Sequence, residues 1–271
     1  FPYTTLFRSM SKHLGNAVNP FDQIEKYGAD AVRFYMMTNS EPWDNLKYDE
    51  KGVDEVRRKF FGTLYNTYSF FSGYANVDAF DNETAQVPVA ERPEIDRWVL
   101  SVLNTLVKGV QKEMESYDPT RAGRLIEDFV NNDLSNWYVR LNRKRFWGKE
   151  MSQDKLAAYQ TLYTCLTTVA KLLAPFAPFF ADQLFCDLGA AQLENTTSVH
   201  LAKFPVADES LIDRELEERM GMAQKITSMV HALRKKVNIA VRQPLQAIMI
   251  PAVDDEQRRH IEAVKDLILS E

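Results

Sequence analysis

Four segments of helical periodicity follow one another through the middle of the chain, and they constrain its fold more than any other feature. They lie at about residues 94–116, 119–147 and 155–173, with a proline-interrupted one running on to residue 185. Apolar residues recur along each at three- and four-residue spacing, which is typical of amphipathic helices. Helices of this kind bury their apolar faces against one another. The sequence therefore predicts a mainly α fold built around a helix bundle.

Further helices are expected before the bundle. A short helical pattern from Pro20 stops at Gly28, and two more patterns cover residues 29–37 and 54–71. The stretch 73–93 that follows is polar and is typical of a connection between units. We expect the main domain boundary inside it.

The region after the bundle is expected to mix structural types. Residues 198–205 have an extended character, and residues 215–236 follow a helical pattern. Residues 245–251, rich in Ile and Met, predict a β-strand, and another helix is expected from about residue 255. Together these patterns predict a partial small α/β unit at the end of the chain.

Composition excludes several classes of protein. The formal net charge is -5, so any surface that binds nucleic acid must be local rather than general. Cys165 and Cys186 lack the spacing of a zinc site or a disulfide framework, and the four histidines are scattered, so no metal site is expected. The apolar runs are shorter than the roughly 20 residues of a membrane span. A cytoplasmic protein with no membrane contact fits these features.

The first chemical signal is the sequence Met-Ser-Lys-His-Leu-Gly-Asn at residues 10–16, followed by Tyr-Gly-Ala-Asp-Ala-Val-Arg at residues 27–33. In a flexible Ser/Gly loop, backbone N–H groups and a lysine can close around phosphate oxygens. The order of these residues resembles the Lys-Met-Ser-Lys-Ser loop of class I aminoacyl-tRNA synthetases. The resemblance implies that Met10, Ser11 and Lys12 bind ATP, and that Lys12 is catalytic because it stabilises the transition state of adenylate formation.

Two positions depart from the family pattern. Ser9 replaces the first lysine of the motif, and His13 replaces the final serine. Residues 1–8 also fail to resemble the strand that precedes this loop in the family. We therefore expect residues 1–9 to be foreign and the native sequence to begin near Met10. The alternative is a solvent-exposed Ser-Lys turn with no ligand.

The second signal is the aromatic and basic segment at residues 136–147. Helical spacing places Leu134, Tyr138 and Leu141 on one face. The opposite face carries Arg140, Arg143, Lys144 and Trp147. Arginine forks suit phosphates and exposed aromatic rings suit unstacked bases, so an RNA is the natural partner.

This segment resembles the anticodon-binding domain of the isoleucyl members of the class, in which Asn-Trp-Tyr runs into an Arg-rich, Phe-Trp end. A second basic run, near residue 234, resembles the junction that follows that domain. The resemblance implies a set of tRNA-binding residues: Trp137, Arg140, Arg143, Lys144, Trp147, Arg234 and Lys235. The alternatives are a solvated charged face, tryptophans in the core, and ordinary cations at a helix C-terminus.

The resemblance divides the chain into four parts. They are a remnant of the catalytic-domain ATP loop at 1–19, a helical stem-contact region with its connection at 20–93, the anticodon-binding bundle at 94–205, and a C-terminal helix with a partial α/β unit at 206–271. It implies a monomeric parent ligase that joins isoleucine to its tRNA with ATP and Mg²⁺. Because the nucleotide-binding fold is expected before residue 1, we expect no ligase activity from this chain alone.

Three rival readings are open from the sequence. The parent enzyme could be specific for valine, because the amino-acid pocket lies outside the chain. The chain could also be a stand-alone tRNA-binding module. A helical scaffold for proteins is the third alternative, and it predicts that tRNA affinity does not depend on Arg140, Arg143 and Lys144.

Overall fold

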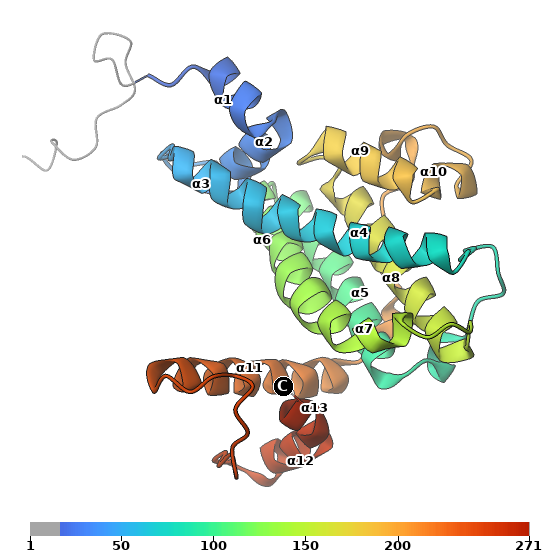
Figure 1. The fold of residues 1–271 in the computed structure, drawn as a ribbon. Coiled ribbons are helices and arrows are strands. Elements are labelled where there is room, and N and C mark those ends of the chain that lie inside the picture. Colours follow the sequence, from blue (N-terminus) through green and yellow to red (C-terminus); the bar gives the residue numbers. More distant parts are fainter. Residues whose placement is uncertain (1–16, 271) are drawn as a thin grey trace, which may run out of the picture.

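The computed structural model describes residues 17–270, and the chain is helical along most of them. Figure 1 shows a central group of long helices, with α9 and α10 at one end and α11 at the other. The described residues contain no β-strand. This arrangement confirms the predicted mainly α fold. None of the described helices combines the length and the apolar character needed to cross a membrane.

The helices before the bundle begin with α1 (Pro20–Tyr27) and α2 (Ala29–Thr38), which Gly28 separates as expected. Gly28 has a φ of 87°, a conformation that residues with a Cβ rarely adopt. The predicted helix at 54–71 is part of a longer rod made of α3 (Glu50–Glu55), the π-helix η3 (Val56–Phe61) and α4 (Gly62–Val77).

The bundle follows the four predicted segments closely. Its long elements are α5 (Glu94–Glu115), α6 (Pro119–Asp128), the π-helix η5 (Phe129–Val139), α7 (Arg140–Phe146), α8 (Gln153–Leu173) and α9 (Pro178–Asp187). Four short elements complete it: η4 (Val89–Glu91), α10 (Ala190–Leu193), η6 (Val199–Leu201) and η7 (Glu209–Leu211). Its core is aromatic, with Trp98, Tyr138, Tyr159, Phe176 and Phe185 fully buried.

The connection between α4 and α5 is fastened to α8 along its length. The backbone N–H of Val87 donates to Gln160 Oε1 at 2.9 Å, and Arg92 Nη1 donates to Thr161 Oγ1 at 2.9 Å. At the start of the connection, the buried Lys155 ammonium lies 2.5 Å from the Asp78 carboxylate. The polar residues of this stretch therefore serve as anchors on the bundle.

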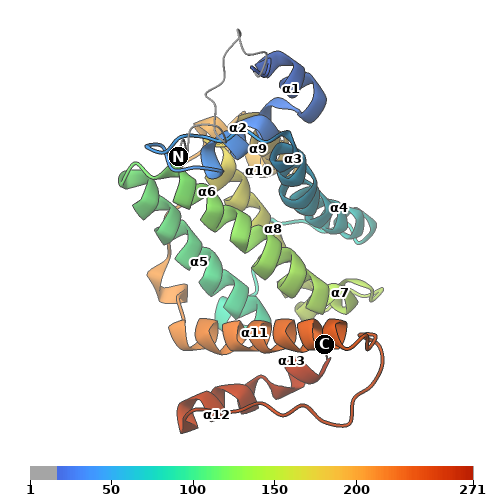
Figure 2. The same cartoon turned by 90° about the vertical axis from the view of Figure 1, so that its left-hand side faces the viewer.

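The C-terminal region consists of α11 (Arg214–Lys236), α12 (Asp255–Ala263) and α13 (Lys265–Ser270). Figure 2 shows α11 lying across one end of the bundle helices, with α12 and α13 beyond it. The predicted β-strand at 245–251 is wrong, because these residues form no ladder with any described part of the chain. A strand needs a neighbour for its backbone N–H and C=O groups. Met249 in this segment is 94% exposed.

Candidate nucleic-acid interface

The candidate interface is carried by one continuous helical rod made of α6, η5 and α7. The Asp118 side chain begins the rod by accepting a hydrogen bond from the backbone N–H of Arg121 at 2.9 Å, and Pro119 follows at the first helical position. In η5 the hydrogen bonds run from residue i to residue i+5, which widens the turn and rotates the faces that follow. Spacing rules for an α-helix therefore hold less well around Trp137 than in α7.

The apolar face of the rod is buried, as the spacing predicts. Leu134 and Tyr138 are fully buried, and Leu141 is half-buried. The Tyr138 hydroxyl donates to Asp96 Oδ1 on α5 at 2.8 Å. Burial raises the pKa of Tyr138 far above its ordinary value, so the hydroxyl stays protonated and this hydrogen bond persists at neutral pH. The contact fixes the rotation of the rod on α5.

The three consecutive cations Arg143, Lys144 and Arg145 have different environments. Arg145 grips Asp96 with both nitrogens of its fork, at 2.6 and 2.9 Å, and the Asp96 side chain is fully buried. Arg143 and Lys144 are exposed on the other side of the helix. Arg145 is thus a structural residue, whereas its two neighbours are available to a ligand.

The exposed face of α7 contains the cations that the sequence placed there. Arg140, Arg143 and Lys144 are exposed, and Trp147 beside them is 58% exposed. Arg140 Nε donates to the Asn136 carbonyl at 2.9 Å, and its guanidinium lies 5.9 Å from the centre of the Trp137 ring. This face combines positive charge with one accessible aromatic ring.

Trp137 has a different environment from Trp147. Its side chain is buried, with 3% of the residue exposed, so its ring is not open to stacking by a base, and the alternative of a tryptophan in the core describes it. The indole Nε1–H is buried and has no hydrogen-bond acceptor among the described residues. Trp137 instead lines a groove between η5 and α11.

This groove has a volume of about 830 Å³ and is the concave part of the candidate interface. Its lining from the rod includes Asp128, Asn132, Asp133, Asn136, Trp137 and Arg140, and its lining from α11 includes Gln224, Lys225, Thr227, Ser228, Met229 and His231. The Thr227 hydroxyl is buried there and, like the Trp137 indole, has no partner among the described residues. Because both atoms are closed to solvent, a ligand in the groove would meet its exposed residues instead, among them Asn132, Asn136 and Arg140.

Asp133 is the electrostatic exception in this groove. Its carboxylate accepts a hydrogen bond from Gln224 Nε2 at 2.9 Å. Burial raises the pKa of Asp133 to about 6, an effect larger than the opposing one of the hydrogen bond. Sequence reasoning missed Asp133, Gln224 and Thr227. The sequence offered one signal for Asp133, which is that it precedes Trp137 by one helical turn. Gln224 and Thr227 lie on α11, about 90 residues further along the chain, so no local pattern pointed to them.

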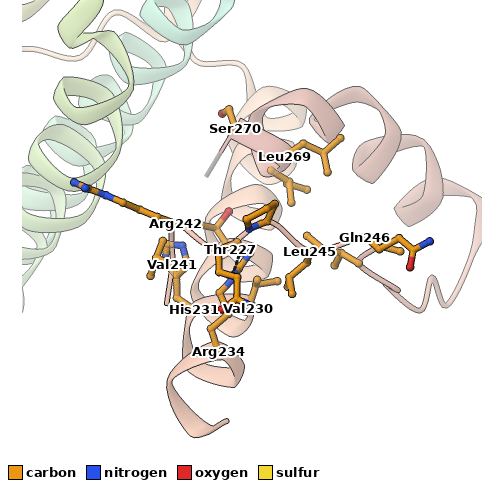
Figure 3. A pocket seen from close by; sticks show the side chains of 15 residues that line it. Thr227, Val230, His231, Arg234, Val241, Arg242, Leu245, Gln246, Leu269 and Ser270 are labelled. Atoms are coloured by element: carbon orange, nitrogen blue, oxygen red, sulfur yellow. Dashed lines mark hydrogen bonds between the residues drawn. The ribbon is translucent and has the colours of Figure 1, made fainter. Parts of the chain in front are cut away.

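The two cations of the second predicted basic site, at the end of α11, also differ in their environments. Arg234 is half-buried, and its Nη1 donates to the carbonyls of Ala240 and Gln243 at 3.1 and 2.8 Å. It thereby holds the loop after the helix, beside a pocket of about 450 Å³ that Figure 3 shows between α11, this loop and α13. Lys235 is exposed. Of the two, only Lys235 projects freely enough to contact a phosphate.

The predicted ATP-binding residues Met10, Ser11 and Lys12 lie outside the described residues 17–270. Within that range, no group of three His, Cys, Asp or Glu side chains is placed to hold a metal ion.

Comparisons with known proteins place these features in a family. Residues 96–249 match the family described as the anticodon-binding domain of tRNA ligase, and residues 7–49 match the family described as tRNA synthetases class I (I, L, M and V). The chain is 68% identical to the isoleucine–tRNA ligase of Bacteroides thetaiotaomicron and 63% identical to that of Porphyromonas gingivalis, each over 97% of this chain. It spans about 23% of the length of these relatives.

Two solved structures share the fold. One is the LeuRS–tRNA–LeuAMS ternary complex of Agrobacterium radiobacter K84, with a TM-score of 0.58 and 21% identity over 77% of this chain and 23% of that chain. The other is a Mycobacterium tuberculosis methionyl-tRNA synthetase, with a TM-score of 0.55 and 21% identity over 65% of this chain and 35% of that chain.

The family match of residues 96–249 covers more than half of the chain, and the helices α5 to α11 that it spans carry the groove and the cationic face. The chain therefore belongs to the family of anticodon-binding domains of tRNA ligases.

Proposed function

We propose that this chain is the anticodon-binding part of an isoleucine–tRNA ligase, the enzyme that attaches isoleucine to its tRNA with ATP. The observation that carries the proposal is the exposed face of Arg140, Arg143, Lys144 and Trp147 on α7, next to the groove under α11. Identities of 59–68% to isoleucine–tRNA ligases favour isoleucine over valine as the amino acid.

The chemistry of this face suits an RNA loop. Arg143 and Lys144 would neutralise phosphates, which supplies affinity and orientation but no sequence readout. Trp147 would stack on an unpaired base, a contact typical of single-stranded RNA recognition. Lys235 would extend the phosphate contacts along α11.

The ATP site of the parent enzyme is a further part of the proposal. The class I match at residues 7–49 includes Met10, Ser11 and Lys12, so we assign to them the ATP contacts and to Lys12 the stabilisation of negative charge during adenylate formation. Mg²⁺ would accompany the nucleotide. We expect the parent enzyme to act in the cytoplasm as a monomer, where Cys165 and Cys186 can stay as the free thiols seen here.

The division of labour along the chain follows from the same proposal. Residues 20–93 would contact the tRNA stem, residues 94–205 would bind the anticodon loop, and residues 206–271 would close the groove with α11. Residues 1–19 belong to the ATP loop. In this scheme the chain alone binds tRNA without charging it, so isoleucine-dependent pyrophosphate exchange by the isolated chain would contradict it.

The test compares two double variants that remove the same charge. Arg143→Ala/Lys144→Ala removes two exposed cations from the proposed face, and Lys112→Ala/Lys203→Ala removes two exposed cations elsewhere. We measure the affinity for isoleucine tRNA as a function of salt. Each lost phosphate contact should lower the slope of log K against log salt by about 0.7–0.9, so the first variant should lose about 1.5 in slope and the control little. Equal losses in both variants would contradict the proposed face.

A further inference from the structure

A stripe of four exposed polar side chains runs along the rod of η5 and α7. Asn132, Asn136, Arg140 and Lys144 are all exposed, and they follow one another at four-residue spacing. Residues four apart are neighbours on one face of a helix. The first two carry neutral amides and the last two carry positive charges. The stripe therefore changes from neutral to cationic along its length.

The neutral part of the stripe lies in the groove between η5 and α11. Asn132 and Asn136 line this groove of about 830 Å³, whereas Arg143 and Lys144 lie outside it. The bases of a single-stranded loop are unstacked and can be turned away from its backbone. A loop that places its phosphates on Arg143 and Lys144 can therefore turn a base into the groove, where it meets the amides.

The two amides differ in the hydrogen-bonding groups that they leave open. Arg140 Nε contacts the backbone carbonyl of Asn136, and no described residue hydrogen-bonds to the Asn136 side chain, so its NH₂ group and its Oδ1 are both available. Asn132 Nδ2 donates to Asp128 Oδ1 at 2.5 Å. This bond turns the NH₂ group of Asn132 toward the carboxylate and leaves Oδ1 as its open acceptor.

No contact within the fold explains Asn136. Its side chain is exposed, and asparagine is less favourable than alanine inside a helix. Neutral amides are suited to the edges of bases, which carry sequence information, whereas cations are suited to phosphates, which are the same in every nucleotide. The amides and the cations of the stripe therefore fit different parts of one RNA.

The other wall of the groove comes from α11 and includes Met229. This residue is 58% exposed, and its unbranched thioether offers an apolar surface for the flat face of a base. The groove thus combines an apolar contact for the face of a base with amides for its edge.

We propose that Asn136 reads the edge of one unpaired base of the bound tRNA, and that Asn132 selects a base with an exocyclic amino group. The inference rests on the proposed tRNA binding and adds a base-reading site to it. Asn136 Oδ1 accepts one hydrogen of the amino group, and its Nδ2 donates to the ring nitrogen beside that group. Asn132 Oδ1 accepts the second hydrogen. Adenine and cytosine fit this pattern, whereas uracil carries a carbonyl oxygen in place of the amino group.

The test uses the 271-residue chain and isoleucine tRNA transcripts in which each adenine or cytosine of the anticodon loop is replaced in turn by uracil. The wild-type chain should bind one of these transcripts about tenfold more weakly than the unchanged tRNA, because a bidentate base contact is lost. Asn136→Ala should bind the unchanged tRNA about tenfold more weakly and should no longer distinguish that transcript from it. Asn132→Ala should reduce the distinction about threefold, because one neutral hydrogen bond is lost.

The dependence on salt separates this role from a phosphate contact. The slope of log K against log salt should stay the same in Asn136→Ala, because no counterion release is lost. Arg143→Ala/Lys144→Ala should show the reverse, with a lower slope and an unchanged distinction between the transcripts. Asn76→Ala, at an exposed position near the end of α4, is the matched control and should keep both properties.

Asn136→Ala should not lower the melting temperature, because the side chain has no partner in the described chain and alanine favours helices. If this variant still distinguished the transcripts, or lowered the salt slope as a phosphate contact does, the base-reading role would be overturned and the cationic face would stand. If the wild-type chain distinguished none of the transcripts, the same conclusion would follow. Failure of the wild-type chain to bind tRNA would overturn both proposals.

Discussion

Arg145 and Lys144 are neighbours in sequence with opposite structural roles. Arg145 makes a two-pronged ion pair with the fully buried Asp96, whereas Lys144 is exposed. Arg145→Ala leaves the Asp96 carboxylate buried and uncompensated, so we expect the free energy of unfolding to fall by about 3–5 kcal/mol. Lys144→Ala should change it by less than about 0.5 kcal/mol. Urea unfolding of both variants measures the difference.

The tRNA affinity of the same variants should show the reverse order. Lys144→Ala should weaken tRNA binding, whereas Arg145→Ala, measured where it is still folded, should act only through the position of α7. A stable Arg145→Ala protein would contradict the structural role of this pair.

The sequence correctly predicted which cations of α7 are exposed, but it contained no sign that Arg145 would meet Asp96, 49 residues earlier. Pairing across elements follows from tertiary packing, which helical spacing alone does not determine.

Asp133 should make tRNA binding depend on pH. Burial raises its pKa to about 6 in the folded chain, so the carboxyl is charged above pH 6 and neutral below it. A negative charge in the groove repels RNA, so we expect affinity to rise as the pH falls from 7.5 to 5.5. Asp133→Asn should therefore flatten the pH profile of tRNA affinity between pH 5.5 and 7.5.

The same group affects stability with a definite sign. The folded-state pKa of Asp133 lies above its ordinary value of 3.8, so the folded state binds more protons than the unfolded state between pH 4 and 6. Stability contributed by this residue is thus present at low pH and is lost as the pH rises through about 6. Asp133→Asn should remove this slope in thermal unfolding measured from pH 4.5 to 7.5. An unchanged slope would contradict the raised pKa.

At the scale of elements, the contact between α2 and α6 depends on one glycine. A Cβ at Gly123 would lie 2.5 Å from Thr38 Cγ2, and Thr38 is fixed by a hydrogen bond from its hydroxyl to the Phe34 carbonyl at 2.8 Å. Gly123→Ala should therefore destabilise the chain by about 1–3 kcal/mol, although alanine favours helices. Gly221→Ala on α11 meets nothing within 4 Å and should stabilise by about 0.5–1 kcal/mol. Thermal unfolding distinguishes the two, and a stabilising Gly123→Ala would contradict the close contact.

The elements were the most predictable part of this protein. Gly28 marks the end of a helix as the sequence indicates, because capping chemistry is local, and Asp118 caps the start of α6 by the same kind of local contact. The π-helices η3 and η5 were not predicted, since their hydrogen bonds differ from those of an α-helix without any change in apolar pattern. The strand at 245–251 failed because strand formation depends on a partner elsewhere.

At the scale of the whole molecule, the polar connection 78–93 behaves as an anchor. Composition indicated a domain boundary there, because polar and turn-forming residues are typical of a connection. The structure also shows which α8 residues bind the connection, and composition does not indicate these contacts. Gln160 and Thr161 bind its backbone and Arg92, and Lys155 pairs with Asp78 where it begins. The region 17–77 is thus tied to the bundle through buried polar contacts.

We therefore expect the N-terminal helices and the bundle to unfold together. Tryptophan fluorescence, which reports mainly on the buried Trp98 and Trp137 of the bundle, and circular dichroism at 222 nm, which reports on all helices, should give one coincident transition in urea. Asp78→Ala should lower the unfolding free energy by about 3–5 kcal/mol, because Lys155, 2% exposed, loses its carboxylate partner. The remaining anchors at Val87 and Arg92 should keep that variant's transition single. If wild-type helicity were lost in two steps, with fluorescence following only the second, the connection would be a hinge and the two regions would be independent units.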